Sequence, residues 1–301
     1  MAAPATPLLP EAILRLEPSE ADALFDRLER TVPLRPAFES IPLRPGTEAI
    51  VFGDTHGDWR STRAAAEEFL VAPESTFLIG LGDYVDRSPD DCGEGSVANA
   101  LYLLGLAARY PDRVHLLQGN HETTRRLAAI PHHLPEEVDL LWGPDGTRYV
   151  RLMGLLERGP YALATGSGAF LAHGGFPRGL LPSPWSNAVD GRSEQRLIEL
   201  VWSECTASRS RRGAIEPWTV GDLDGFLNQS GLTLFLRGHD PDLTGRALYS
   251  GRCLTLQTTR IYEQFGGVIV ARLPLGSPVR STDDLSIEHL PTEGRSYPEP
   301  E

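Results

Sequence analysis

Short apolar runs recur along the chain, and most of them end in a cluster of polar residues. The pattern appears in "AIVFGDTHGD", "TFLIGLGDYVDRS", "RVHLLQGNHE", "GAFLAHGG" and "LTLFLRGHD". The runs are rich in Leu, Phe, Ile and Val and alternate little with polar residues, which is typical of strands covered on both faces. We therefore predict five buried strands, each followed by a polar loop.

Amphipathic segments lie between these runs. The stretches "WRSTRAAAEEFL" and "SVANALYLLGLAARY" have the periodicity of helices. Strands that alternate with helices predict an α/β domain, in which ligands gather beyond the carboxyl ends of the strands. Further on, "GRCLTLQTT" and "GGVIVARL" predict a pair of strands around the loop "RIYEQF".

The two ends of the chain differ from the middle. Residues 1–18 are rich in Pro and Ala, and a short helix is predicted from Ser19, which has Asp22 three places on as a weak capping signal. The last stretch is polar and contains several prolines, so at most local order is expected there. We assign residues 1–45 to an N-terminal arm with a short helix, 46–272 to a catalytic domain and 273–301 to a C-terminal tail.

The polar clusters carry residue types that bind metals. Any one of them also suits a solvated turn or a structural histidine, but their recurrence at five strand ends favours a shared site. Carboxylates, imidazoles and an amide without a thiolate suit Mn, Fe or Zn. The candidate ligands are Asp54, His56, Asp83, Asn120, His173 and His239. Six ligands suit two ions that share a carboxylate, an arrangement that serves phosphoester hydrolysis.

Other residues near these ligands suit the rest of that reaction. Arg87 offers a guanidinium fork for phosphate, and His121 follows Asn120 directly, with Asp86 as a partner that could orient it. The pair His132-His133 is expected in a surface loop because no strand places it. His115 is expected in the core or facing it, and His289 in the tail receives no role.

Composition limits the class of protein. The chain has 301 residues, 41% hydrophobic, which is enough for one main domain. A net charge of −13 argues against a nucleic-acid partner. Three widely spaced cysteines fit no disulfide framework and indicate a reducing compartment. No stretch has the length and apolar character of a membrane span, so we predict a cytoplasmic protein without a membrane partner.

The motifs "GDTHG", "GDYVDRS", "GNHE", "HGG" and "RGH", in this order, resemble those of the phosphoprotein phosphatases, metal-dependent serine/threonine phosphatases among the calcineurin-like metallophosphoesterases. The resemblance runs from about residue 49 to 272. It implies a central β-sandwich flanked by helices and a site for two divalent metal ions. It further implies direct attack on the phosphoryl group by a metal-bridging hydroxide, with no phosphoenzyme.

Carried over to this chain, the resemblance implies a role for each candidate residue. Asp83 would bridge one metal held by Asp54 and His56 and a second held by Asn120, His173 and His239. His121 would be the general acid, paired with Asp86. The residues that would contact substrate are Arg87, Arg212 with Arg211 and Arg209 as alternatives, and Tyr262.

The chain departs from the family pattern in three places. Ser88 stands where the family has glycine, Glu204 and Cys205 replace an aspartate and a proline, and "LQTTRIYEQF" replaces a characteristic loop. These departures predict a divergent, bacterial-type member and leave substrate preference open. We expect a phosphatase for phosphoserine and phosphothreonine in proteins or peptides. The alternatives are a nucleotide phosphoesterase or dinucleoside polyphosphate hydrolase of the same fold, and a catalytically silent scaffold.

Overall fold

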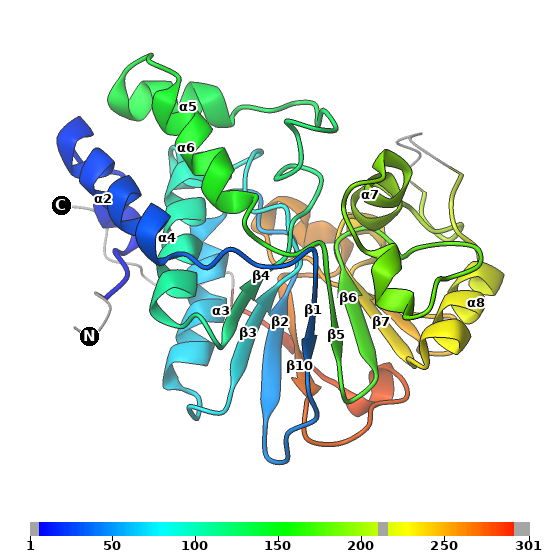
Figure 1. The fold of residues 1–301 in the computed structure, drawn as a ribbon. Coiled ribbons are helices and arrows are strands. Elements are labelled where there is room, and N and C mark those ends of the chain that lie inside the picture. Colours follow the sequence, from blue (N-terminus) through cyan, green and yellow to red (C-terminus); the bar gives the residue numbers. More distant parts are fainter. Residues whose placement is uncertain (1–5, 210–215, 292–301) are drawn as a thin grey trace.

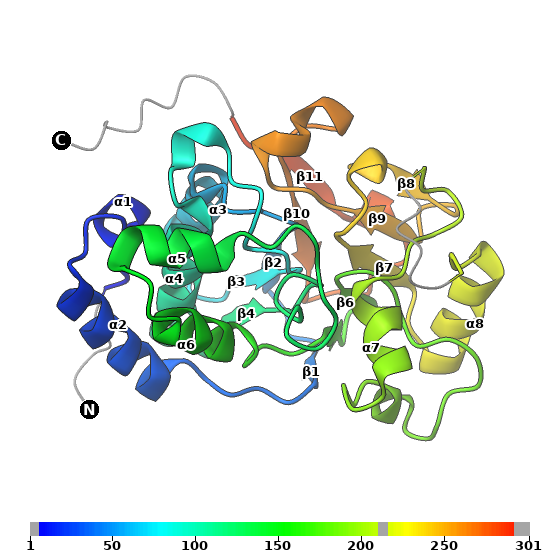
Figure 2. The same cartoon turned by 90° about the horizontal axis from the view of Figure 1, so that it is seen from above.

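Two β-sheets face each other at the centre of the fold, and helices cover both outer faces (Figure 1, Figure 2). The computed structural model describes residues 6–209 and 216–291. In the five-stranded sheet, with the order β11-β10-β2-β3-β4, the strands are β2 (Glu48–Phe52), β3 (Phe77–Gly80), β4 (Val114–Leu116), β10 (Ile269–Pro274) and β11 (Ser286–His289). Strands β2, β3 and β4 are parallel, whereas β10 runs antiparallel to both of its neighbours.

The second sheet has six strands in the order β1-β5-β6-β7-β9-β8. Its members are β1 (Phe38–Ile41), β5 (Ala162–Thr165), β6 (Ala169–Ala172), β7 (Leu234–Arg237), β8 (Ala247–Leu248) and β9 (Cys253–Thr255). Strands β6, β7 and β9 are parallel, so their carboxyl ends meet at one edge of the sheet.

The central strands of both sheets are buried on both faces, and their alternate residues enter different apolar clusters. Val51 of β2 packs between the sheets in the same cluster as Leu171 and Leu236 of the six-stranded sheet. Its neighbours Ile50 and Phe52 point the other way, toward the helices. This double burial is the physical reason why the strands read as continuous apolar runs.

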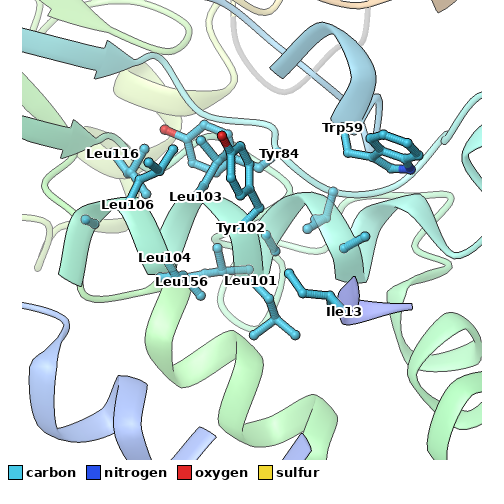
Figure 3. Close-up of a cluster of buried hydrophobic side chains, with 14 of the residues drawn as sticks. Ile13, Trp59, Tyr84, Leu101, Tyr102, Leu103, Leu104, Leu106, Leu116 and Leu156 are labelled. Atoms are coloured by element: carbon cyan, nitrogen blue, oxygen red, sulfur yellow. The ribbon is translucent and has the colours of Figure 1, made fainter. Parts of the chain in front are cut away.

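Helices α3 (Trp59–Val71) and α4 (Gly95–Arg109) lie against the five-stranded sheet. Four further helices contact α4 or one another on its outer side: α1 (Pro10–Ile13), α2 (Pro18–Thr31), α5 (Leu134–Trp142) and α6 (Thr147–Leu156). Figure 3 shows the cluster around α4, in which Leu101 and Leu104 meet Ile13 and Leu156, and Tyr84 packs nearby. On the other side, α7 (Glu194–Val201) and α8 (Val220–Ser230) bury apolar residues with the outer face of the six-stranded sheet.

The predicted fold class, a calcineurin-like sandwich flanked by helices, is confirmed. The five predicted strands are β2, β3, β4, β6 and β7, and the two predicted helices are α3 and α4. Within the described ranges, no helix is both long enough and apolar enough to cross a membrane.

Regular structure lies near both limits of the described chain. The predicted short helix is α2, but it begins at Pro18, where Glu17 and Glu20 form a capping box in place of Ser19 and Asp22. Strand β1 lies within residues 1–45 and completes the six-stranded sheet, and β11 lies within residues 273–301 and pairs with β10.

The predicted pair of strands around "RIYEQF" also differs from the structure. Both strands exist, as β9 and β10, but they belong to different sheets. The loop between them carries the chain from one sheet to the other at the edge where the polar clusters gather.

Candidate metal centre

The six predicted ligands come together where the two sheets end. They follow β2, β3, β4, β6 and β7, and all six side chains are buried: Asp54, His56, Asp83, Asn120, His173 and His239. Because parallel strands end at the same edge, residues up to 185 positions apart in sequence become neighbours.

Asp83 lies between two groups of candidate ligands. On one side, Oδ2 of Asp83 is 3.2 Å from Nε2 of His173, which in turn lies 3.0 Å from Oδ1 of Asn120 and 3.1 Å from Nδ1 of His239. On the other side, Nε2 of His56 is 3.9 Å from Oδ2 of Asp83 and 4.0 Å from Oδ2 of Asp54. The carboxylate of Asp83 therefore lies close to both groups of candidate ligands.

Backbone carbonyls fix the ring orientation of two of the histidines. Nδ1 of His56 lies 3.1 Å from the carbonyl oxygen of Val85, and Nδ1 of His173 lies 3.1 Å from that of Leu81. If each Nδ1 carries the proton and donates it, each Nε2 presents a lone pair to the centre, as metal-binding histidines do. The lone pair on Nε2 of His173 then faces the amide oxygen of Asn120, an arrangement that a cation stabilises. The donor set therefore fits divalent metal ions.

Two motif glycines let the backbone approach the ligands closely. A Cβ on Gly238 would lie 2.1 Å from Oδ1 of Asp54, and a Cβ on Gly119 would lie 2.2 Å from Oδ1 of Asp83. Any side chain at these positions would displace a candidate ligand. The glycines of "RGH" and "GNHE" are thus explained by the space that the carboxylates need.

The backbone at the site is unusual for residues other than glycine. Seven such residues in the described ranges have positive φ, and five of them belong to the site: His56, Asp83, Asp86, Arg87 and His239. Each costs on the order of 1–3 kcal/mol relative to an ordinary conformation. The surrounding sheets hold these residues in conformations that direct their side chains inward.

Four of the candidate ligands have shifted pKa values, because burial and the charges of neighbouring ligands act on each of them. Burial lowers the pKa of His56 to about 3. Burial also acts to lower the pKa of His173, but Asp83 and Asp54 outweigh it and raise that pKa to about 9. Burial raises the pKa of Asp54, whereas for Asp83 the positive charge of His173 and His121 overcomes burial and the pKa falls. Carboxylates of this kind favour bound positive charge.

The predicted pair His121 and Asp86 forms a direct contact beside this centre. Nδ1 of His121 lies 2.5 Å from Oδ2 of Asp86, and both side chains are buried. Burial opposes a charge on His121, but Asp83 and Asp86 outweigh burial, so the pKa of His121 is raised. The ring of His121 also packs edge-on against His56, at a centroid distance of 5.2 Å.

His132 lies in a loop, as expected, but its half-buried side chain contacts the buried Asp86, which was not expected. Its Nδ1 lies 2.9 Å from Oδ2 of Asp86, and its Nε2 lies 3.0 Å from the hydroxyl of Tyr149. His133 is exposed, as expected. His115 is buried and contacts Glu39, consistent with a core position, and His289 is exposed on β11. No sequence signal links His132 to Asp86, because 46 residues separate them.

The structure describes only some of the residues predicted to contact substrate. Nη1 of Arg87 donates to the hydroxyl of Tyr262 over 2.9 Å, and the Tyr262 ring packs edge-on against His56. Arg212 and Arg211 lie outside the described residues. Arg209 is exposed, and its backbone N–H donates to Asp242.

Two supporting residues were missed by sequence reasoning. Nε2 of Gln257 donates to Oδ2 of Asp54 over 2.9 Å. Arg260 donates to both oxygens of the fully buried Asp58 and also pairs with Asp91. Arg260 begins the 3₁₀ segment Arg260–Phe265 that carries Tyr262, so this ion pair anchors the segment beside the centre. Asp58 belongs to the motif "GDTHGD", but its partner lies about two hundred residues away and no local pattern reveals it.

Comparison with known proteins agrees with this geometry. The sequence pattern of the calcineurin-like phosphoesterases matches residues 48–243, which contain all six candidate ligands. The chain belongs to this family. The family consists of hydrolases, and its metallophosphoesterase chemistry implies divalent metal ions. The predicted resemblance to the phosphoprotein phosphatases within the family is also confirmed, by the relatives that follow.

Several relatives are named serine/threonine-protein phosphatases. A probable serine/threonine-protein phosphatase of Encephalitozoon cuniculi is 28% identical over 72% of this chain, and the match spans 48% of that relative's length. The serine/threonine-protein phosphatase 4 catalytic subunit of Saccharomyces cerevisiae is 28% identical over 81% of this chain and 77% of its own length.

A solved structure shares the fold. It is a serine/threonine phosphatase from Saccharomyces cerevisiae described as similar to human phosphatase PP5, and it superposes with a TM-score of 0.74 at 20% identity, covering 91% of this chain and 89% of its own. A cold-active protein-tyrosine phosphatase of Shewanella gives a TM-score of 0.55 at 14% identity, covering 87% of this chain and 84% of its own. These two similarities support the same fold.

Proposed function

We propose that the protein hydrolyses phosphoserine and phosphothreonine monoesters of phosphoproteins, using two divalent metal ions. The observation that carries the proposal is that Asp83 stands between two groups of buried metal-ligand side chains, with the His121–Asp86 pair directly beside them. The names of the relatives support a protein substrate.

The residues divide into two ligand sets. Asp54 and His56 would hold one ion, Asn120, His173 and His239 the other, and Asp83 would bridge them. When bound, two such ions supply positive charge for the phosphoryl oxygens and lower the pKa of water so that it becomes a nucleophile near neutral pH. We propose manganese as the ion for assays in vitro. Iron and zinc suit the same ligands.

The chain supplies the remaining steps. Arg87 would bind a phosphoryl oxygen through its guanidinium, and Tyr262, which already accepts a hydrogen bond from Arg87, would hold that side chain toward the centre. His121 would donate the proton from Nε2 to the leaving alkoxide, while Asp86 at Nδ1 holds the ring and stabilises its charged form. Arg212 is a proposed further phosphate ligand.

We also propose a cellular compartment and a source of positive charge for the site. All three cysteines are buried and free of disulfides, which supports a reducing compartment such as the cytoplasm. The positive charge needed for an anionic substrate comes from the metals and Arg87, because the chain as a whole is acidic.

Hydrolysis of a phosphothreonine peptide, run beside hydrolysis of a dinucleoside tetraphosphate, tests the proposal. We expect phosphate release from the peptide by the manganese-loaded protein and none by the metal-stripped protein or the Asp83→Asn variant. Cleavage of the nucleotide alone would point to a nucleotide phosphoesterase with the same centre. No hydrolysis of either substrate, with metal demonstrably bound, would favour a silent scaffold.

A further inference from the structure

The carboxylate of Asp86 has more partners than orienting one histidine requires. Its Oδ2 accepts from Nδ1 of His121 and Nδ1 of His132, at 2.5 Å and 2.9 Å. Its Oδ1 accepts from the backbone N–H groups of His133 and Leu134, at 2.7 Å and 3.1 Å. Four donors use the four lone-pair positions of a carboxylate, so its orientation is fixed.

His132 is itself held by a second element. The hydroxyl of Tyr149, on α6, lies 3.0 Å from Nε2 of His132, and the two rings pack at a centroid distance of 5.7 Å. A neutral imidazole that donates from Nδ1 to Asp86 accepts at Nε2, where the tyrosine hydroxyl can donate. The side chain of His132 is 15% exposed, whereas that of Asp86 is fully buried.

We propose that His132 and Tyr149 form a positioning relay that holds Asp86 against His121 and thereby aligns the proton donor with the leaving oxygen. The proposal rests on the proposed function, because His121 has a proton to deliver only in that reaction. Neither residue is among the six candidate metal ligands, so in the relay both act only through Asp86. Their contribution is to limit the rotation of Asp86, which would otherwise turn its Oδ2 away from His121.

A relay of this kind has a particular kinetic consequence. An alkoxide such as that of threonine leaves only with a proton, whereas 4-nitrophenolate leaves without one. A misaligned donor therefore slows hydrolysis of the phosphothreonine peptide and spares 4-nitrophenyl phosphate. Loss of folded protein, in contrast, slows both substrates equally.

The test compares two substitutions at His132. His132→Leu removes both hydrogen bonds, and His132→Asn retains an amide N–H near the position of Nδ1 but cannot reach Tyr149. For the manganese-loaded protein we expect kcat on the peptide to fall about tenfold or more in His132→Leu and less in His132→Asn. We expect kcat on 4-nitrophenyl phosphate to change less than about twofold and KM to stay constant.

Tyr149→Phe is expected to change the same ratio of rates, by a smaller factor. The matched controls are His289→Asn, an exposed histidine on β11, and Tyr161→Phe, whose hydroxyl contacts Arg126 at the surface. If His132→Leu leaves the ratio of kcat on the peptide to kcat on 4-nitrophenyl phosphate unchanged, the relay is overturned.

A readout independent of activity separates this proposal from the proposed function. In the metal-free protein, the proton between His121 and Asp86 is expected far downfield in the NMR spectrum. His132→Leu should shift or broaden it, and His289→Asn should not. If the wild type hydrolyses neither substrate, the proposed function fails, and this signal still decides whether His132 positions Asp86. A signal that His132→Leu leaves unchanged contradicts the relay.

Discussion

The floor and the rim of the site are built in different ways. The floor consists of the six candidate ligands, each within a few residues of a strand end. Glycines approach Asp54 and Asp83 closely, and His56, Asp83 and His239 have positive φ angles. The rim consists of His132, Tyr149, Arg260 and Tyr262, which come from loops and helices and are held by side-chain contacts across long stretches of sequence. The floor is therefore specified by local sequence, and the rim by tertiary packing.

The difference between floor and rim indicates which residues should affect every substrate and which should affect some substrates more than others. The floor holds all six candidate ligands for the metal chemistry that the family implies, and all six lie within the matched residues 48–243. Two rim residues, Arg260 and Tyr262, lie in "LQTTRIYEQF", one of the three places at which this chain departs from the family pattern. Changes to the floor should therefore abolish activity on every substrate, and changes to the rim should alter rates selectively.

The largest effect is expected for the shared carboxylate of the floor. Asp83→Asn removes the negative charge that serves both ligand groups, so phosphate release should fall by at least about a thousandfold. Assays with the phosphothreonine peptide and with 4-nitrophenyl phosphate measure this. Asp112→Asn, at an exposed position, is the control. A loss confined to one substrate would contradict the distinction between floor and rim.

The proton donor should give a large but selective effect. His121→Asn is expected to slow hydrolysis of an alkyl phosphate about a hundredfold or more and that of 4-nitrophenyl phosphate far less. The comparison of kcat between the two substrates is the measurement. Full activity of this variant on the alkyl phosphate would remove His121 from the role of general acid.

A glycine of the floor tests whether close packing positions the ligands. Gly238→Ala places a methyl group against Asp54, so manganese affinity should fall by about tenfold or more while the protein remains folded. Gly225→Ala, in α8 with open space around it, is the matched change and should raise stability by about 0.5–1 kcal/mol. Titration with manganese and thermal unfolding measure both. Wild-type affinity in Gly238→Ala would contradict the explanation of this motif glycine.

The rim ion pair should affect stability and substrate use together. Arg260→Met leaves the buried Asp58 without its guanidinium partner, which should cost about 1–3 kcal/mol and raise KM by releasing the segment that carries Tyr262. Arg272→Met breaks pairs with three partly exposed carboxylates and should cost less than about 1 kcal/mol. Equal costs for the two variants in urea unfolding would show that burial of Asp58 does not matter.

The smallest effect is expected from Glu137, on α5, the helix that follows the loop of His132. Its carboxylate accepts from the backbone N–H and hydroxyl of Ser96 at the start of α4, yet burial raises its pKa to about 7, with Asp86 adding a smaller like-charge effect. A carboxyl group whose pKa is higher in the folded than in the unfolded protein stabilises the fold at low pH. This stability is fully present below the unfolded-state pKa of about 4.3 and is lost as the pH rises through about 7.

Glu137→Gln should therefore reduce the decline in the free energy of unfolding between pH 5 and pH 8, by about 1 kcal/mol. Urea unfolding at several pH values measures this. Glu157→Gln, on a partly exposed carboxylate that pairs with Arg125, is the control and should leave the decline as in the wild type. An identical pH dependence in Glu137→Gln and the wild type would show that this carboxylate has no raised pKa.

The apolar runs and the residues after them predict an α/β domain with the ligand candidates at the strand ends, and the family resemblance adds the central β-sandwich. The sequence does not predict β1 or β11, since short strands at sheet edges gain their stability from partners rather than from their own pattern. His132 could not be linked to Asp86 from the sequence, for a related reason. Its loop has no periodicity, and only the packing of α5 and α6 brings it to Asp86.

The most direct test of the account is a count of bound metal ions. After removal of all metal, dialysis against manganese and elemental analysis should give two ions per wild-type chain, and at most one per chain for Asp83→Asn. One ion per chain in the wild type, or an Asp83→Asn variant that still holds two, would contradict a centre in which Asp83 joins two ligand groups.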